Sequence, residues 1–67
     1  MSKEQIEPMD WEEIIMNVGN PVYDKKEERW RILRGYMRTV NGFLVNFTDD
    51  WENWEYFQNK KLYLKEV

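Results

Sequence analysis

The chain has 67 residues and a mass of 8.4 kDa, which is room for a single domain. The absence of cysteine and histidine excludes disulfides and Ser–His or Cys–His catalytic pairs, and nearly excludes a structural zinc site. The net charge of −3 argues against generic nucleic-acid binding, which usually needs a basic excess. Aromatic residues make up 16% of the chain, and we expect them to supply the packing that so short a chain needs.

The first eight residues are polar and end at Pro8, so we expect residues 1–8 to be a flexible lead-in and residues 9–67 to form one domain. Residues 1–5 contain no hydrophobic segment, and no signal peptide is expected. No apolar run approaches the roughly 18 residues that cross a bilayer. The prediction is a cytoplasmic protein that does not bind membranes.

Residues 10–18 predict a short helix. Asp10 and Glu13 have the spacing of a capping box, in which each side chain bonds the backbone of the other residue. Gly19 can adopt the left-handed conformation that ends a helix, and Pro21 prevents its return. The apolar stripe consists of Trp11, Ile14, Ile15 and Val18.

From residue 21 onward, apolar residues recur with a period of two, which is typical of half-buried strands. Pro21–Tyr23 is predicted to be an edge strand because proline has no N–H to pair. Residues 24–28 are predicted to be a solvated loop, and Gly35 a bulge within the second strand. The predicted strands are residues 21–23, 30–40, 43–47, 54–57 and 62–64.

Asn41-Gly42 is the strongest local signal, because this dipeptide readily adopts the positive φ angles of a type I′ turn. Such a turn predicts a buried face made of Phe43, Val45 and Phe47. The cross-strand pairs would be Val40 with Phe43, Arg38 with Val45, and Tyr36 with Phe47.

Five short strands joined by tight turns predict a mainly β fold, a five-stranded antiparallel barrel with a short N-terminal α-helix over one open end. The predicted core consists of Trp11, Ile14, Ile15, Val22, Trp30, Ile32, Phe43, Val45, Phe47, Trp54, Tyr56, Leu62 and Leu64.

Three segments carry a resemblance to the SH3-like family of small barrels and to its Tudor-like pattern. They are Gly19-Asn20-Pro21-Val22-Tyr23, Trp30-Arg31-Ile32-Leu33 and Val45-Asn46-Phe47-Thr48-Asp49. The resemblance covers residues 19–65 and implies an SH3-like barrel. In its short, cysteine-free and aromatic-rich style the chain also resembles accessory proteins of phages and prophages of Gram-positive bacteria, which implies binding to a host protein.

We expect a non-catalytic protein-interaction module, a monomer or weak dimer without cofactor or metal. Exposed aromatic residues dominate protein–protein contacts, and the predicted contact surface consists of Tyr36, Asp49, Asp50 and Trp51. The acidic residues of this region lack the order of an EF-hand loop, which favours a solvated acidic loop.

The alternative is nucleic-acid binding through a basic strand and the loop before it. Its candidate residues are Lys26, Arg31, Arg34 and Arg38, whose charges could contact phosphates. Two further hypotheses stay open. One is an aromatic cage for a methylated cation formed by Trp30, Tyr36, Phe47 and Trp51. The other is mimicry of DNA phosphates by Glu12, Glu13, Asp49, Asp50, Glu52 and Glu55.

Overall fold

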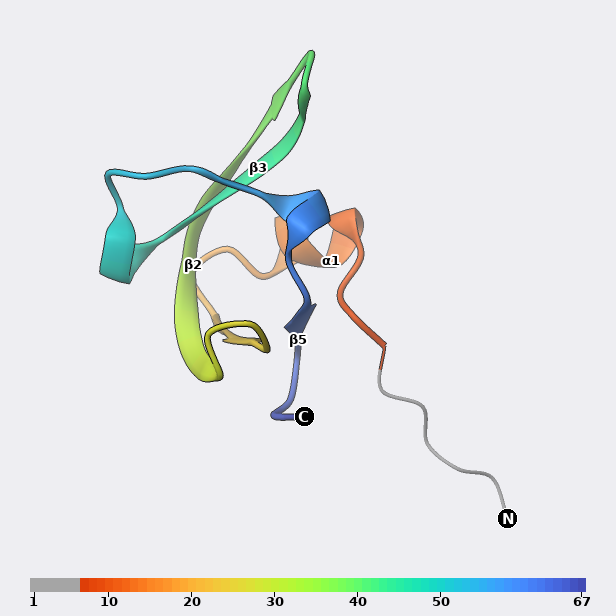
Figure 1. The fold of residues 1–67 in the computed structure, drawn as a ribbon, viewed down its shortest axis with the longest axis vertical. Coiled ribbons are helices and arrows are strands. Elements are labelled where there is room, and N and C mark those ends of the chain that lie inside the picture. The colour runs from red at the N-terminus through yellow and green to blue at the C-terminus, as the bar shows by residue number, and fades with distance from the viewer. Residues whose placement is uncertain (1–6) are drawn as a thin grey trace.

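The computed structural model describes residues 7–67 and contains one short helix and one antiparallel sheet, in the strand order β4-β3-β2-β1-β5 (Figure 1). The elements are α1 (Trp11–Met16), β1 (Pro21–Asp24), β2 (Arg29–Thr39), β3 (Gly42–Phe47), β4 (Glu55–Tyr56) and β5 (Leu62–Tyr63). Two 3₁₀ turns, η1 (Thr48–Asp50) and η2 (Phe57–Asn59), flank β4. The prediction of a mainly β fold with five strands and an N-terminal helix is confirmed. The sheet is not closed into a barrel, since β4 and β5 form its two edges.

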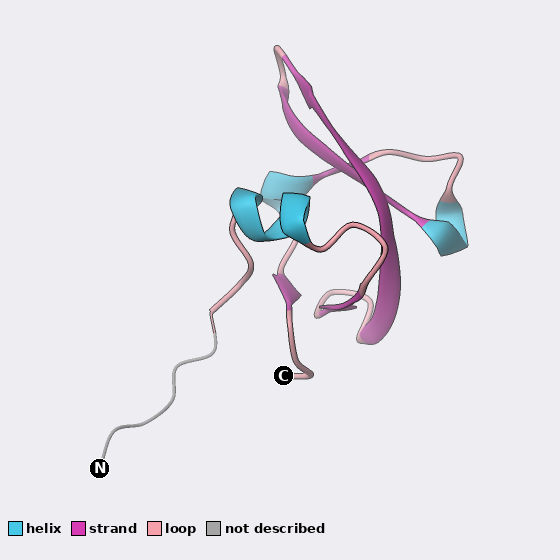
Figure 2. Cartoon of the chain, turned by 180° about the vertical axis from the view of Figure 1, so that it is seen from behind, coloured by secondary structure: helices cyan, strands magenta, loops and turns pink. Residues whose placement is uncertain are grey.

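The long β2–β3 hairpin divides the molecule. α1 and η2 lie together on one side of it and η1 lies on the other (Figure 2). Most of the predicted lead-in falls outside the described residues. In the described part of the chain, no helix is both long and apolar enough to span a bilayer.

The helix begins with the predicted capping box. The N–H of Glu13 donates to Asp10 Oδ1 at 2.9 Å, and the N–H of Asp10 donates to Glu13 Oε1 at 3.1 Å. Gly19 has the expected positive φ of 92°. However, α1 ends at Met16, so the stripe predicted to reach Val18 is too long. Ile14 is its only fully buried residue, whereas Ile15 and Val18 are exposed.

β1 is not the edge strand that its proline predicts. It lies between β2 and β5, with Tyr23 opposite Tyr63 and Asp24 opposite Leu62. Pro21 lies outside the two-residue pairing with β5, so its missing N–H leaves that ladder intact. The loop prediction for residues 24–28 also fails at Asp24, which is a fully buried strand residue.

The orientation of β2 is the largest departure from expectation. Trp30 and Ile32 were predicted to be buried, but both are exposed, while Arg31 and Leu33 point inward and are buried. A strand buries either its odd or its even positions, and here the buried Arg31 is neutralised by carboxylates from other elements. The predicted bulge is confirmed, because the register with β3 shifts between Leu33 and Gly35.

The hairpin turn differs by one residue from the prediction. Val40 and Asn41 form the turn, Thr39 pairs with Gly42, and of the two residues Asn41 and Gly42 only Gly42 has a positive φ, of 135°. The Thr39 hydroxyl stabilises this register by accepting from the N–H of Asn41 and donating to the carbonyl of Gly42, each at 3.1 Å. The pairs are Arg38 with Phe43, Tyr36 with Val45 and Leu33 with Phe47.

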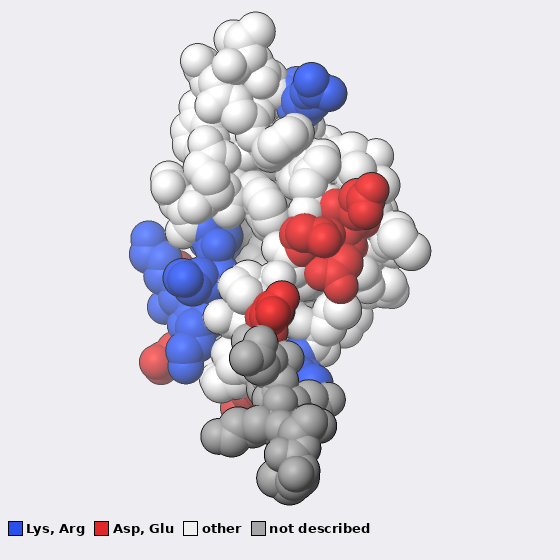
Figure 3. Space-filling view, turned by 90° about the vertical axis from the view of Figure 1, so that its right-hand side faces the viewer, with Lys and Arg blue, Asp and Glu red and all other residues white. Residues whose placement is uncertain are grey.

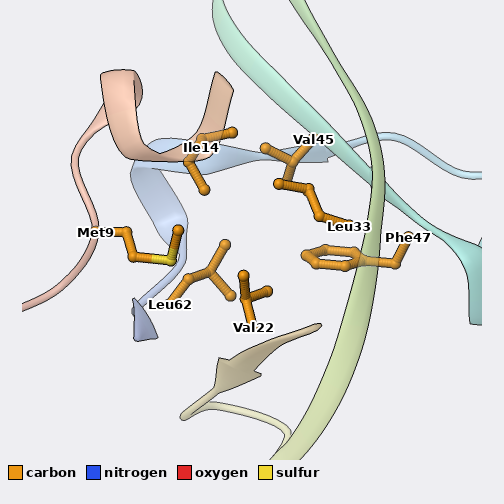
Figure 4. Close-up of a cluster of buried hydrophobic side chains, with 7 residues drawn as sticks. All are labelled: Met9, Ile14, Val22, Leu33, Val45, Phe47 and Leu62. Atoms are coloured by element: carbon orange, nitrogen blue, oxygen red, sulfur yellow. The ribbon is translucent and has the colours of Figure 1, made fainter. Parts of the chain in front are cut away.

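The hydrophobic core lies between α1, the sheet and the segment before the helix (Figure 4). Met9 joins it from that segment, and its N–H donates to the carbonyl of Leu62 at 2.7 Å. The core consists of Met9, Ile14, Val22, Leu33, Val45, Phe47 and Leu62. Predicted core members that the structure leaves exposed are Ile15, Trp30, Ile32, Trp54, Tyr56 and Leu64.

A second, aromatic layer joins α1 to the hairpin and η2. The ring of Trp11 stacks on Phe43 with centroids 4.3 Å apart, meets Phe57 at 5.4 Å, and contacts Tyr36 edge-on at 5.5 Å. Ring pairs in such geometries add stability beyond the area that they bury. These contacts explain how a helix of six residues stays docked.

Candidate functional site

A group of charged residues lies beside the core, with Asp24 and Arg31 buried at its centre. We call it the charge cluster, and it consists of Asp24, Arg31, Asp49, Glu55 and Lys60. Arg31 donates from Nη1 to Asp24 at 2.9 Å, and from Nη2 to Asp49 and to Glu55 at 3.1 Å each. Lys60 donates to Asp24 at 3.2 Å and also pairs with Glu55. The guanidinium carbon lies 3.9 Å over the ring of Phe47, which places the cation against the core.

These contacts hold the charge cluster in its ionised form. Burial alone would raise the pKa of Asp24, but hydrogen bonds from Arg31, Lys60 and the backbone outweigh it and lower the pKa. The pKa of Asp49 and that of Glu55 are lowered in the same way, burial being outweighed by their cationic partners. Burial would lower the pKa of Arg31, but its three carboxylate partners raise it above its ordinary value.

The charge cluster is therefore built for structure more than for chemistry. Carboxylates whose pKa is lowered cannot act as general acids near neutral pH. Among residues 7–67, no buried side-chain nitrogen or oxygen lacks a hydrogen-bond partner. Within the same residues, no group of acidic side chains has an arrangement that could hold a metal ion.

The predicted contact surface is only partly assembled. Asp49 belongs to the charge cluster and also pairs with Arg29 at 2.6 Å, while Asp50 is half-buried and accepts from Asn53 at 2.8 Å. Trp51 follows in the same turn and is 58% exposed. Tyr36 instead packs on Trp11 of α1, on the other side of the hairpin from η1 (Figure 2). The structure thus brings Asp49, Asp50 and Trp51 together, in η1 and directly after it, and leaves Tyr36 apart.

Asn46 fixes the loop that carries Trp51 and Trp54. Its side chain is fully buried, and Nδ2 donates to the carbonyls of Trp51 at 3.0 Å and Asn53 at 2.8 Å. Its Oδ1 accepts from Arg34 at 3.1 Å. Sequence reasoning missed this residue, although an amide between the buried Val45 and Phe47 is a signal that a loop needs its hydrogen bonds.

Exposed apolar side chains lie on the face of the sheet away from the core. Trp30 and Ile32 alternate with the buried Arg31, and Met37 lies opposite Leu44, which pairs in turn with Tyr56 of β4. The Cη2 atom of Trp54 lies 4.0 Å from the point where a Cβ on Gly35 would stand, so this ring covers the bulge. We call Trp30, Ile32, Met37, Trp54 and Tyr56 the outer patch.

The residues of the nucleic-acid hypothesis do not form one surface. Arg31 is buried in the charge cluster, and Arg34 is bound to Asn46. Lys26 lies in the loop before β2, whereas Arg38 is near the tip of the hairpin. The residues of the aromatic-cage hypothesis lie apart, because Phe47 is in the core and Trp30 faces outward. Of the residues of the DNA-mimicry hypothesis, Asp49 and Glu55 are already paired with Arg31.

Comparisons with protein-family models, with curated proteins and with solved structures find no match to this chain.

Proposed function

We propose that this chain is a small, non-catalytic protein-interaction module whose contact surface is the outer patch together with Trp51. One observation carries the proposal. Three of the four tryptophans, Trp30, Trp51 and Trp54, are between 40% and 58% exposed. A domain this small needs apolar area in its core, and exposed large apolar surface marks interaction sites. Tryptophan and tyrosine are also the residues that dominate protein–protein affinity.

The non-catalytic part of the proposal rests on the chemistry of the side chains. With no histidine or cysteine in the chain, acid–base work would fall mainly to carboxylates. Three carboxylates, those of Asp24, Asp49 and Glu55, meet in the charge cluster, and their lowered pKa values keep them ionised. An ionised carboxylate tied to a guanidinium is a poor proton donor and a weakened base.

We also propose that the fold is related to that of the SH3-like small barrels. Supporting it, β2 is long, has a bulge between Leu33 and Gly35, and pairs with β1 through its first half and with β3 through its second half. A 3₁₀ turn separates β4 from β5, which then pairs with β1. A cytoplasmic location is part of the proposal because the chain contains no cysteine, and the role of a phage or prophage accessory factor rests on the resemblance of the sequence alone.

The experiment is an affinity capture from Gram-positive bacterial lysate with immobilised wild-type protein and with the Trp51→Ala and Trp54→Ala variants, each run with and without nuclease. The matched control is Leu64→Ala, an exposed apolar residue that follows β5. We expect a protein that is retained by wild type and by Leu64→Ala in both arms and lost with the tryptophan variants. Retention that disappears with nuclease would support the nucleic-acid alternative and contradict the proposal.

A further inference from the structure

A cavity of about 300 Å³ lies between the loop after β1 and the turn before β5. Four side chains line it: Lys25, Lys26, Asn59 and Lys61. Three of them carry an ammonium group, the fourth carries an amide, and none is a carboxylate. We call this cavity the lysine pocket.

Backbone hydrogen bonds hold the walls of the lysine pocket in place. The N–H of Lys25 donates to the carbonyl of Lys61 at 3.0 Å, which joins the two walls. The carboxylate of Asp24 accepts from the N–H groups of Lys26 at 3.1 Å and Glu27 at 3.2 Å. Lys60 points inward to the charge cluster and is almost fully buried, while its neighbour Lys61 is exposed and lines the cavity. The pocket is therefore a built feature of the fold.

Two positive charges of the lysine pocket have no opposite charge beside them. Within residues 7–67, neither Lys26 nor Lys61 forms an ion pair, whereas Lys25 donates to an oxygen of Val67 at 3.3 Å. The neighbouring Glu27 lies 3.8 Å from Arg29 instead. Figure 3 shows Lys and Arg side chains gathered on one flank, apart from the main group of acidic side chains. Lys26 and Lys61 carry like charges on the two walls of one cavity, and a bound anion would offset both charges.

We propose that the lysine pocket binds the phosphate groups of a compact polyphosphate ligand. Lysine is a common phosphate ligand because its ammonium is a compact charge with several donors. The volume lies at the small end of the range for ligand sites, roughly 300–1,000 Å³. No aromatic residue lines the cavity, and its apolar lining comes from the methylene stems of the lysines. The ligand class is pyrophosphate, tripolyphosphate or the polyphosphate part of a larger molecule. This site is independent of the outer patch.

Titration of the ¹⁵N-labelled protein with pyrophosphate, followed by NMR and calorimetry, tests the proposal. We expect saturable binding with amide shifts confined to residues 24–27 and 59–61. Lys61→Gln and Lys26→Gln should each weaken binding about tenfold, as expected when a hydrogen bond to a charged group is lost. The control is Arg38→Gln, which removes the same charge near the hairpin tip and should leave affinity unchanged.

Two results would overturn the proposal. One is the absence of saturable pyrophosphate binding by the folded wild-type protein. The other is an equal loss of affinity in Arg38→Gln and Lys61→Gln, because that would mean attraction to net charge and not to a site. The thermal midpoint of each variant should match that of wild type, since the substituted side chains are exposed.

Discussion

The Nη1 atom of Arg31 lies 2.9 Å from Oδ2 of Asp24, and these side chains are only 2% and 0% exposed. This pair sets the orientation of β2. Because side chains alternate across a strand, an inward Arg31 places Trp30 and Ile32 on the opposite face. The charge cluster thus connects the core to the outer patch, and burying one cation leaves two large apolar side chains available for a partner.

Replacing Arg31 by methionine should destabilise the fold by about 3–5 kcal/mol, because Asp24 would remain buried without its strongest partner. A domain of this size has a total stability of roughly 3–10 kcal/mol, so the variant should be largely unfolded at neutral pH. Arg38→Met, on the exposed part of β2, should stay within about 0.5 kcal/mol of wild type. Urea unfolding followed by circular dichroism measures both. Equal stabilities for the two variants would contradict the role given to the charge cluster.

Stability should be greatest near neutral pH and should fall in acid. The folded-state pKa values of Asp24, Asp49 and Glu55 are lowered, so these carboxylates release protons more readily in the folded protein than in the unfolded chain. Their stabilisation is complete above the unfolded values, about 4, and is lost as pH falls through the lower folded values. Urea midpoints between pH 7 and pH 2 test this. A midpoint that rises on acidification would be incompatible with the ion pairs described.

Gly42 and Gly35 should respond differently to alanine. Gly42 has a φ of 135°, and a Cβ there would stand 2.7 Å from Nε2 of Gln58. Gly42→Ala should therefore cost about 1–3 kcal/mol, the range for strained backbone conformations. At Gly35 the nearest atom, Cη2 of Trp54, would lie 4.0 Å from the Cβ in ordinary contact, so Gly35→Ala should be nearly neutral. Thermal unfolding of both variants gives the comparison, and the reverse ranking would refute the observed turn register.

Asn46→Ala should release the loop that presents Trp51 and Trp54. The change leaves two carbonyl oxygens without their donor, at a cost of about 1–3 kcal/mol. Hydrogen exchange at residues 51–54 should become faster than in wild type. Asn41→Ala, at the exposed hairpin turn, serves as the control and should change neither quantity. Unaltered exchange in Asn46→Ala would show that this amide does not hold the loop.

Local signals in the sequence predicted local features well. The capping box at Asp10 and Glu13, the left-handed Gly19 and the bulge at Gly35 each depend on a few adjacent residues. The hairpin was placed correctly but shifted by one residue, because the hydroxyl of Thr39 competes with the preference of Asn41-Gly42 for the turn.

The orientation of β2 could not be predicted from β2 alone. A period of two shows that one face of the strand is buried without showing which one. Tryptophan and isoleucine are buried far more often than arginine, so the sequence favours the face that carries Trp30 and Ile32. The carboxylates that neutralise Arg31 come from β1, η1 and β4, up to 24 residues away in the sequence. The lysine pocket escaped prediction for the same reason, since its walls come from two separate turns.

The most direct test of the central claim compares the urea unfolding of Ile32→Thr with that of Leu33→Thr. With Ile32 on the outer patch and Leu33 in the core, Ile32→Thr should change the free energy of unfolding by less than about 1 kcal/mol. Leu33→Thr should lower it by about 2–5 kcal/mol. If Ile32→Thr proves the more damaging change, β2 buries its other face, Arg31 is not part of the interior, and the outer patch does not exist as described.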